Sequence, residues 1–437
     1  MAAAGGARVR RVRGGEPDRA ASVLSGESFG REKTHSSRHF WEEILLSTYH
    51  NLFTVIRAAL TGRAGQLEQP VDYGAMERLG RRHQILPLLY VGLSKCGADA
   101  QMLRPIADRA MQAVCFDQNQ LYCLEQVRTL LTEHGLDFML LKGSSLKRLY
   151  PSSELRLMSD IDILVREEQY ERLRPLMREA GFAEGMQTDH ELMWRDRNGM
   201  LIEFHRRLIP SYNSDYYAYF RDPWEKAERR AACEYAMRPE DEYLYVFTHL
   251  TKHYRDGGIG LRHMLDLWMF RRAYPELDRA YLERELRRLE LDAFHRNILA
   301  TVAVWLDGRQ ETELTRTITE RILVSGAFGI REAFDAANAA RQSAKTADIH
   351  AAKQRSLRRL VFLPYSSMKK RYPMLERFPA LLPVMWTARW FDAVLNRRDH
   401  IARQYERLEQ INPTVVDAYN HELAQVGLKF ERTADGH

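Results

Sequence analysis

The hydrophobic residues of this chain follow a helical period over most of its length and a strand-like period only in a short central stretch. Between Phe40 and about Leu136, apolar side chains recur every three or four positions, which places them on one face of a helix. The spacing is clearest near the end of this region, at Leu121, Leu124, Val127 and Leu131. Gly135 then predicts the end of the last helix. Residues 39–135 are therefore predicted to be a helical region.

Two short apolar runs, Phe138–Leu141 and Ile161–Val165, have the length and composition of buried strands. A helix is predicted to begin at Ser144 and to be broken at Pro151, because proline cannot continue a helix from within. A second helix is predicted over Glu168–Ala180, where Gly181 ends it. The chain therefore changes here from purely helical to alternating strand and helix.

After this stretch the helical spacing returns, most clearly over Glu240–Leu250 and Leu261–Ala273. The pattern predicts an α+β protein, in which a small core with a mixed sheet, residues 136–210, is embedded in helices. Helical regions are expected at residues 211–340 and at residues 341–437.

A β-hairpin is predicted within the core, around the dipeptide Asn198-Gly199. Asn-Gly favours a type I′ turn because both central residues of that turn need positive φ. With the dipeptide at the tip, Trp194 is expected to pair with Glu203. Alternation along the second strand then points Ile202 and Phe204 into the core. The opposite face carries Leu201, Glu203 and His205.

The net charge of +6 over 437 residues is unevenly distributed. Residues 1–38 hold eight basic and four acidic side chains and are predicted to be a disordered basic tail. Residues 341–371 hold nine basic side chains and one acid, Asp348, while the remainder has 48 basic against 54 acidic residues. Because positive charge is confined to a tail and one segment, the composition argues against a long nucleic-acid groove across the core.

Cysteine spacing and hydropathy predict a cytoplasmic protein. The four cysteines show no metal-binding spacing, which favours reduced thiols in the core. No apolar run reaches the roughly 18–20 residues needed to span a bilayer. The basic segment and the aromatic stretch Phe378–Phe391 are expected to form an exposed helix; contact with an anionic membrane surface is the secondary interpretation.

Candidate chemistry lies in the core, where Asp160 and Asp162 alternate with Ile161 and Ile163. Residues two apart on a strand share a face, so the two carboxylates point the same way while the isoleucines face the core. Paired carboxylates repel each other unless a cation lies between them, and oxygen ligands of this kind suit Mg²⁺, especially with phosphate oxygens. Aspartate is also depleted in strands, which favours a functional role here.

The turn before this strand contains residues that fit a phosphate group. Gly143 allows a close backbone approach, and the helix start that follows it offers N–H groups and the Ser144 hydroxyl. Lys142 and Arg156 could neutralise a triphosphate, although solvated surface charge is almost as good an interpretation of both.

Together these motifs resemble the nucleotidyltransferase superfamily whose core is similar to DNA polymerase β. More narrowly, the chain resembles a group of poorly characterised bacterial nucleotidyltransferases. The matching residues are Lys142-Gly143, Arg156, Asp160-Ile161-Asp162 and Glu203-Phe204-His205, with similar flanks at Arg82–Tyr90 and Gly260–Leu267. The resemblance implies that Glu203 lies beside the aspartates as a third carboxylate. It also implies that Asp160, Asp162 and Glu203 are catalytic and bind two Mg²⁺ ions, while Lys142, Gly143, Ser144 and Arg156 bind the nucleotide.

The resemblance implies transfer of a nucleoside monophosphate from an NTP to a hydroxyl group. The mildly acidic body favours a small-molecule, sugar or peptide acceptor. Two alternatives stay open: an enzyme that AMPylates proteins or acts like an antitoxin, and a non-catalytic nucleotide sensor. The sequence does not define the oligomeric state.

Several further side chains allow two interpretations. His205 could orient Glu203 or the acceptor, or could be a structural partner. His249 and His253 are four residues apart and could bind zinc, but buried or supporting roles fit better because the metalloprotease glutamate is missing. Arg262 and Asp266, also four apart, are predicted to form an ion pair along a helix.

Overall fold

The computed structural model describes residues 34–188, 190–211, 213–327, 361–396 and 413–429, together with residues 329, 334, 337 and 358. The chain divides into two compact units, residues 1–47 and residues 48–437. Most of the predicted basic tail and most of the basic segment 341–371 lie outside the described residues. The second unit carries the sheet and the candidate site.

Helices precede the sheet, as the sequence predicts. They are α2 (Thr34–Thr61), α3 (Tyr73–His83), α4 (Leu86–Lys95) and α5 (Ala100–Glu133). Helix α5 packs against α4 and ends just before Gly135, whose φ of 62° lies in the left-handed region that favours glycine.

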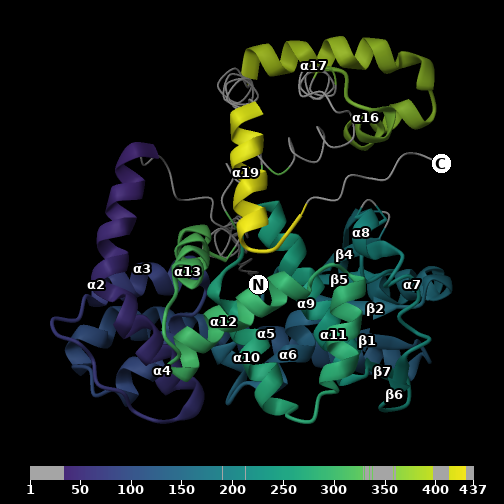
Figure 1. Ribbon diagram of the computed structural model, residues 1–437. Coiled ribbons are helices and arrows are strands. Elements are labelled where there is room, and N and C mark those ends of the chain that lie inside the picture. The colour runs from purple at the N-terminus through teal and green to yellow at the C-terminus, as the bar shows by residue number, and fades with distance from the viewer. Residues whose placement is uncertain are drawn as a thin grey trace, which may run out of the picture. The chain divides into compact units, whose positions relative to one another are not determined.

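The second unit contains a seven-stranded mixed sheet with the strand order β3-β4-β5-β2-β1-β7-β6. Figure 1 labels these strands apart from β3. Its strands are β1 (Phe138–Leu140), β2 (Ile161–Val165), β3 (Ala183–Gln187), β4 (Glu191–Arg195), β5 (Leu201–His205), β6 (Ala227–Arg229) and β7 (Glu234–Met237). Strand β2 runs parallel to β5 and antiparallel to β1, and β1 runs parallel to β7. The predicted mixed sheet is confirmed, and it is larger than expected because β6 and β7 follow residue 210.

Short helical segments connect these strands. They are α6 (Lys142–Leu146), η1 (Lys147–Leu149), η2 (Ser153–Leu155), η3 (Glu167–Gln169), α7 (Tyr170–Glu179) and α8 (Ser214–Tyr217). One face of the sheet packs on α5 and α7 through buried side chains such as Val127 and Leu173. Ile161, Ile163, Ile202 and Phe204 all belong to this core, as predicted. The polar side chains that alternate with them therefore lie on the other face.

The hairpin register differs from the prediction by one residue. Met193 pairs with Glu203, and Trp194 pairs with Ile202, so the Trp194 side chain belongs to the core. The Asp196 carboxylate accepts hydrogen bonds from the backbone N–H groups of Asn198 (2.8 Å) and Met200 (2.7 Å). These bonds close a five-residue loop between Arg195 and Leu201 in place of a two-residue turn.

The chain after β7 is helical wherever it is described. The elements are α9 (Pro239–Asp256), α10 (Leu261–Ala273), α11 (Arg279–Arg288), α12 (Asp292–Asp307), α13 (Glu313–Ser325), α16 (Tyr365–Arg371), η4 (Pro373–Glu376), η5 (Pro379–Leu381), α17 (Leu382–Asn396) and α19 (Pro413–Gln425). Among the described helices, we find none with the length and apolar character needed to cross a membrane.

All four cysteines are free thiols. Only Cys123 is buried, and Cys115 is exposed, so the predicted core placement is correct for one cysteine and wrong for another. Helix α5 turns Cys115 to solvent because that position lies off its buried stripe.

Candidate active site

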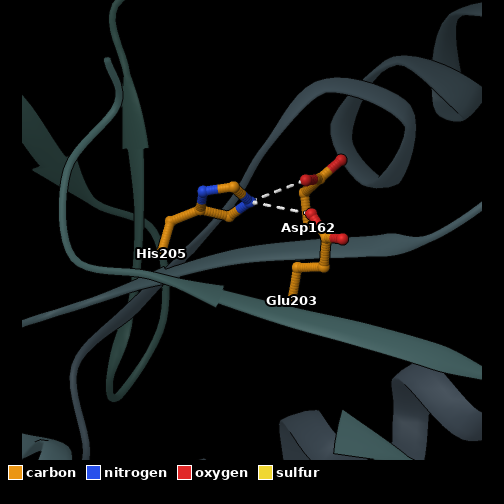
Figure 2. A group of neighbouring side chains, drawn as sticks. All are labelled: Asp162, Glu203 and His205. Atoms are coloured by element: carbon orange, nitrogen blue, oxygen red, sulfur yellow. Dashed lines mark hydrogen bonds and ion pairs between the residues drawn. The ribbon is translucent and has the colours of Figure 1, made fainter. Parts of the chain in front are cut away.

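The two neighbouring strands β2 and β5 bring the predicted carboxylates together. Asp162 on β2 is the direct partner of Glu203 on β5, and partners on adjacent strands point to the same face. His205 follows two positions after Glu203 and shares that face. One ligand atom from each of these three side chains lies within 4.8 Å of the others (Figure 2). The structure thus supplies the adjacency that the sequence left to resemblance.

The imidazole of His205 points toward both carboxylates (Figure 2). Its Nε2 lies 2.7 Å from Oδ1 of Asp162 and 3.7 Å from Oε2 of Glu203. The three residues are nearly buried, with exposed fractions of 2% for Asp162, 9% for Glu203 and 3% for His205. Burial lowers the pKa of His205, helped by the charge of Lys142. The neutral ring therefore donates its Nε2–H to Asp162 and fixes the orientation of that carboxylate.

Lys142 supplies a positive charge to the same cluster. Its Nζ lies 2.8 Å from Oδ1 of Asp162. The residue begins α6, directly after β1, and the Leu141 N–H donates to the backbone carbonyl of Asp162 at 3.1 Å. Lys142 has a φ of 46°, a region that residues with a Cβ rarely adopt. Strain of this kind persists where the surroundings fix the conformation, often at functional sites.

The carboxylates differ in proton affinity because their surroundings differ. Burial opposes the charge of Asp162, but Lys142 and the hydrogen bond from His205 outweigh it and hold the pKa of Asp162 below its usual range. Burial, with Asp162 and Asp160 nearby, raises the pKa of Glu203 to about 8. Burial and the neighbouring Asp162 also raise the pKa of Asp160 to about 6. Three carboxylates this close remain ionised together only when a cation offsets their repulsion.

A small pocket, with a cavity volume of about 80 Å³, opens beside these strands. Its wall, as the described residues form it, contains Asp160 and Asp162 but neither Glu203 nor His205. Asp160 directly precedes β2 and does not belong to the three-residue group with Glu203. The two aspartates thus face the pocket, while Glu203 supports them from the adjacent strand.

Of the four predicted nucleotide-binding residues, Lys142, Gly143 and Arg156 line the pocket, and Ser144 is not part of its wall. A Cβ on Gly143 would lie 2.8 Å from Nη1 of Arg156 and 2.9 Å from Cβ of Met158, so the close packing requires glycine. The Ser144 N–H donates to the Leu141 carbonyl at 3.0 Å and is already engaged.

Arg156 is buried and bound to α10. Its Nε and Nη2 donate to the two carboxylate oxygens of Asp266 at 3.1 and 2.7 Å. The Tyr150 hydroxyl also donates to Asp266, at 2.8 Å. The predicted ion pair between Arg262 and Asp266 is therefore wrong, because Arg156 already occupies Asp266, and Arg262 donates to the Leu157 carbonyl at 2.7 Å.

The pocket lining also contains side chains that were not predicted at the site. His249 comes from α9, and Arg262, His263 and Asp266 come from α10. His249 lies 3.1 Å from His253 between their Nε2 atoms, and burial lowers the pKa of both rings. The similarity of residues 260–267 to the bacterial group was the available signal that this helix belongs to the site.

Comparison with known proteins agrees with these features. A model of a family described as uncharacterised nucleotidyltransferases matches residues 69–307, more than half of the chain. The chain belongs to this family, and membership makes it a nucleotidyltransferase. Among solved structures, the solution structure of antibiotic-resistance factor ANT(2'')-Ia matches with 13% identity and a TM-score of 0.30, over 41% of this chain and 99% of that one. No curated protein matches the chain.

Proposed function

We propose that this nucleotidyltransferase uses Mg²⁺ to transfer a nucleoside monophosphate from an NTP to a hydroxyl group of a small-molecule, sugar or peptide acceptor. The observation that carries the proposal is the buried pair Asp162 and Glu203, in register on adjacent parallel strands, with Asp160 beside it on a pocket wall. A cluster of carboxylates that a cation must neutralise, beside a pocket that opens to solvent, suits a metal-bound polyphosphate.

The donor set of the cluster fits a magnesium ion. Asp160, Asp162 and Glu203 offer carboxylate oxygens, the ligands that Mg²⁺ prefers, and His205 holds Asp162 in one orientation by a hydrogen bond. We assign the three carboxylates as the residues that hold two ions. When bound, the ions lower the pKa of the acceptor hydroxyl and offset the charge of the leaving pyrophosphate.

The reaction forms a bond between the acceptor oxygen and the α-phosphorus of the NTP and breaks the bond from that phosphorus to the departing pyrophosphate. The hydroxyl proton passes to solvent. We assign Lys142 to binding of phosphate oxygens, since its ammonium group lies on the pocket wall, and Gly143 to the close approach of the chain beside it. Arg156 adds positive charge while its pair with Asp266 fixes α10 against the turn. Ser144 is assigned to the support of this turn.

The charge distribution favours a small acceptor over a nucleic acid. Outside residues 1–38 and 341–371 the sequence has 48 basic and 54 acidic residues, so it offers no general attraction for a polyanion.

Pyrophosphate release from each NTP, with acceptor libraries and with cell lysate, tests the proposal. Wild-type protein should release pyrophosphate in the presence of Mg²⁺, and the release should stop when the metal is chelated. Asp162→Asn and Glu203→Gln should lower turnover by at least about a hundredfold, the scale of losing transition-state charge stabilisation. Glu184→Gln, on the exposed strand β3 of the same sheet, is the matched control and should keep full activity.

Full turnover by Asp162→Asn would overturn the proposal. Labelled protein products from lysate would show that the acceptor is a protein side chain. NTP binding without pyrophosphate release for any acceptor would indicate a nucleotide sensor instead.

A further inference from the structure

Arg262 is a buried cation that lines the same pocket as Asp160 and Asp162. It is 9% exposed and comes from the first turn of α10. Its Nη1 donates to the Leu157 carbonyl at 2.7 Å, and its Nε is buried without a hydrogen-bond partner. Among the residues that the structure describes, no carboxylate lies within ion-pairing distance of this guanidinium group.

The neighbouring buried cations differ from Arg262 in this respect. Lys142 is paired with Asp162, and Arg156 is paired with Asp266 through two hydrogen bonds. A buried charge without a partner is unfavourable, and proteins keep such groups paired or bound to a ligand. Arg262 thus has no directly paired carboxylate among the described residues.

Asp266 and Asp160 offset this charge only in part. Burial beside Arg156 lowers the pKa of Arg262 to about 10, which still leaves it charged at neutral pH. Burial and Arg262 together lower the pKa of His263 to about 4, so that ring is neutral. Arg262 therefore keeps a positive charge on the pocket lining, which attracts an anion.

The start of α10 is held firmly in place. The N–H of Leu261 donates to Nδ1 of His83 at 3.3 Å, and Nε2 of the same ring lies 3.1 Å from the Leu323 carbonyl. A Cβ on Gly260 would lie 2.8 Å from Cα of Ala327, so the backbone there is closely packed. Arg262 is consequently pre-positioned at the pocket, as a binding residue needs to be.

From this arrangement we infer that Arg262 binds the triphosphate of the nucleotide and is the main anion contact from the helical region after the sheet. The inference deepens the proposed function, on which it rests for the identity of the ligand. A guanidinium group presents several N–H donors in a plane and can contact two phosphate oxygens at once. Because Nη1 is engaged with the Leu157 carbonyl and Nε is buried, we assign the phosphate contact to Nη2.

Calorimetry of Arg262→Gln, with a non-hydrolysable NTP analogue, inorganic tripolyphosphate and the nucleoside as ligands, tests the inference. The variant should bind the analogue and tripolyphosphate at least about tenfold more weakly, and the nucleoside with unchanged affinity. Arg262→Lys, which keeps the charge without the planar geometry, should show a smaller loss. Arg321→Gln is the matched control, because the Arg321 side chain is only 10% exposed and is not on the pocket wall.

Unchanged affinity of Arg262→Gln for both triphosphate ligands would overturn the inference, as would an equal loss of nucleoside affinity. Thermal melting of both arginine variants separates a binding defect from unfolding, and Arg262→Lys serves if Arg262→Gln does not fold. Binding of inorganic phosphate to protein saturated with the analogue tests for an anionic acceptor. If Arg262→Gln weakens only the binding of inorganic phosphate in this experiment, the assignment of Arg262 to the triphosphate is also overturned.

Failure of the proposed function gives a different result. Wild-type protein that binds tripolyphosphate through Arg262, yet releases no pyrophosphate with any acceptor, would leave the inference standing and remove the transfer reaction. Pyrophosphate release by wild-type protein, together with unchanged triphosphate affinity in Arg262→Gln, would overturn the inference and leave the transfer reaction standing.

Discussion

The ammonium group of Lys142 lies 2.8 Å from Oδ1 of Asp162, so an internal cation partly neutralises the carboxylate cluster at the centre of the site. Both side chains are largely removed from solvent, and Lys142 has a left-handed backbone conformation. The pair explains why Asp162 is charged in a buried position beside Glu203. It also means that a bound metal ion and Lys142 act on the same carboxylate.

Lys142→Met should destabilise the protein, because it leaves a buried carboxylate without its cation. Loss of one partner from a buried pair costs about 3–5 kcal/mol, which urea denaturation would measure as a lower free energy of unfolding. Lys226→Met is the control: Lys226 is half-exposed and lies 3.4 Å from Asp241, so its loss should cost at most about 1 kcal/mol. Mg²⁺ should raise the melting temperature of Lys142→Met more than that of wild type. Equal shifts would show that the two cations do not act on the same carboxylate.

Stability without metal should fall as the pH rises from about 5 to 8. The pKa of Glu203 is raised to about 8 and that of Asp160 to about 6, so the folded state binds more protons than the unfolded state over this range. A carboxyl group whose pKa is raised by folding stabilises the folded state fully at pH values below its pKa in the unfolded chain. This stabilisation is lost as the pH rises through its pKa in the folded protein. Each extra proton contributes a slope of about 1.4 kcal/mol per pH unit. Asp162 has a lowered pKa, so it changes the stability only at more acidic pH, where protonation of its carboxylate destabilises the folded state.

Denaturation at several pH values, with and without Mg²⁺, measures this effect. Glu203→Gln should flatten the decline above pH 6, and saturating Mg²⁺ should abolish it by favouring the ionised carboxylates. A wild-type profile that is flat from pH 5 to 8 without metal would contradict the raised pKa values.

The sequence could predict the elements whose signals are local. The apolar run of β2 and the spacing of α10 define both elements with the bounds that the structure shows, Ile161–Val165 and Leu261–Ala273. Strands β6 and β7 escaped prediction because three or four residues are too few to show an alternating pattern. The hairpin register was wrong because hydrogen bonds to the Asp196 side chain outweighed the preference of Asn-Gly for a two-residue turn.

Within the site, the sequence predicts which side chains belong there better than it predicts which residues they contact. Alternation correctly placed Asp162 and Glu203 on the polar face, while only the parallel pairing of β2 with β5 makes them neighbours. The rule that helix residues four apart interact suggested a partner for Asp266 on its own helix. Its actual partner, Arg156, is 110 positions away, and only the folded chain brings the two together.

Gly143→Ala should destabilise the turn beside the site. The added Cβ would meet Nη1 of Arg156 and Cβ of Met158 at 2.8 and 2.9 Å, closer than real contacts allow. Overpacking of this kind costs about 1–3 kcal/mol, measurable by thermal or urea denaturation. Gly74→Ala, where the nearest atom is the mobile end of Arg78 at 3.2 Å, should be close to neutral. Equal stability of the two variants would mean that the turn can move away from Met158.

His205→Phe should weaken metal binding while the fold is kept. The neutral imidazole donates a hydrogen bond to Asp162 at 2.7 Å, and phenylalanine fills the same buried space without a donor. Loss of a partner that orients a metal ligand typically lowers metal affinity by about 10–100-fold. Titration with Mn²⁺ followed by electron paramagnetic resonance would measure the affinity. His295→Phe is the control, because His295 bonds to the Tyr243 hydroxyl at 2.8 Å on the helical side of the protein. Unchanged Mn²⁺ affinity in a folded His205→Phe protein would show that His205 is only a packing residue.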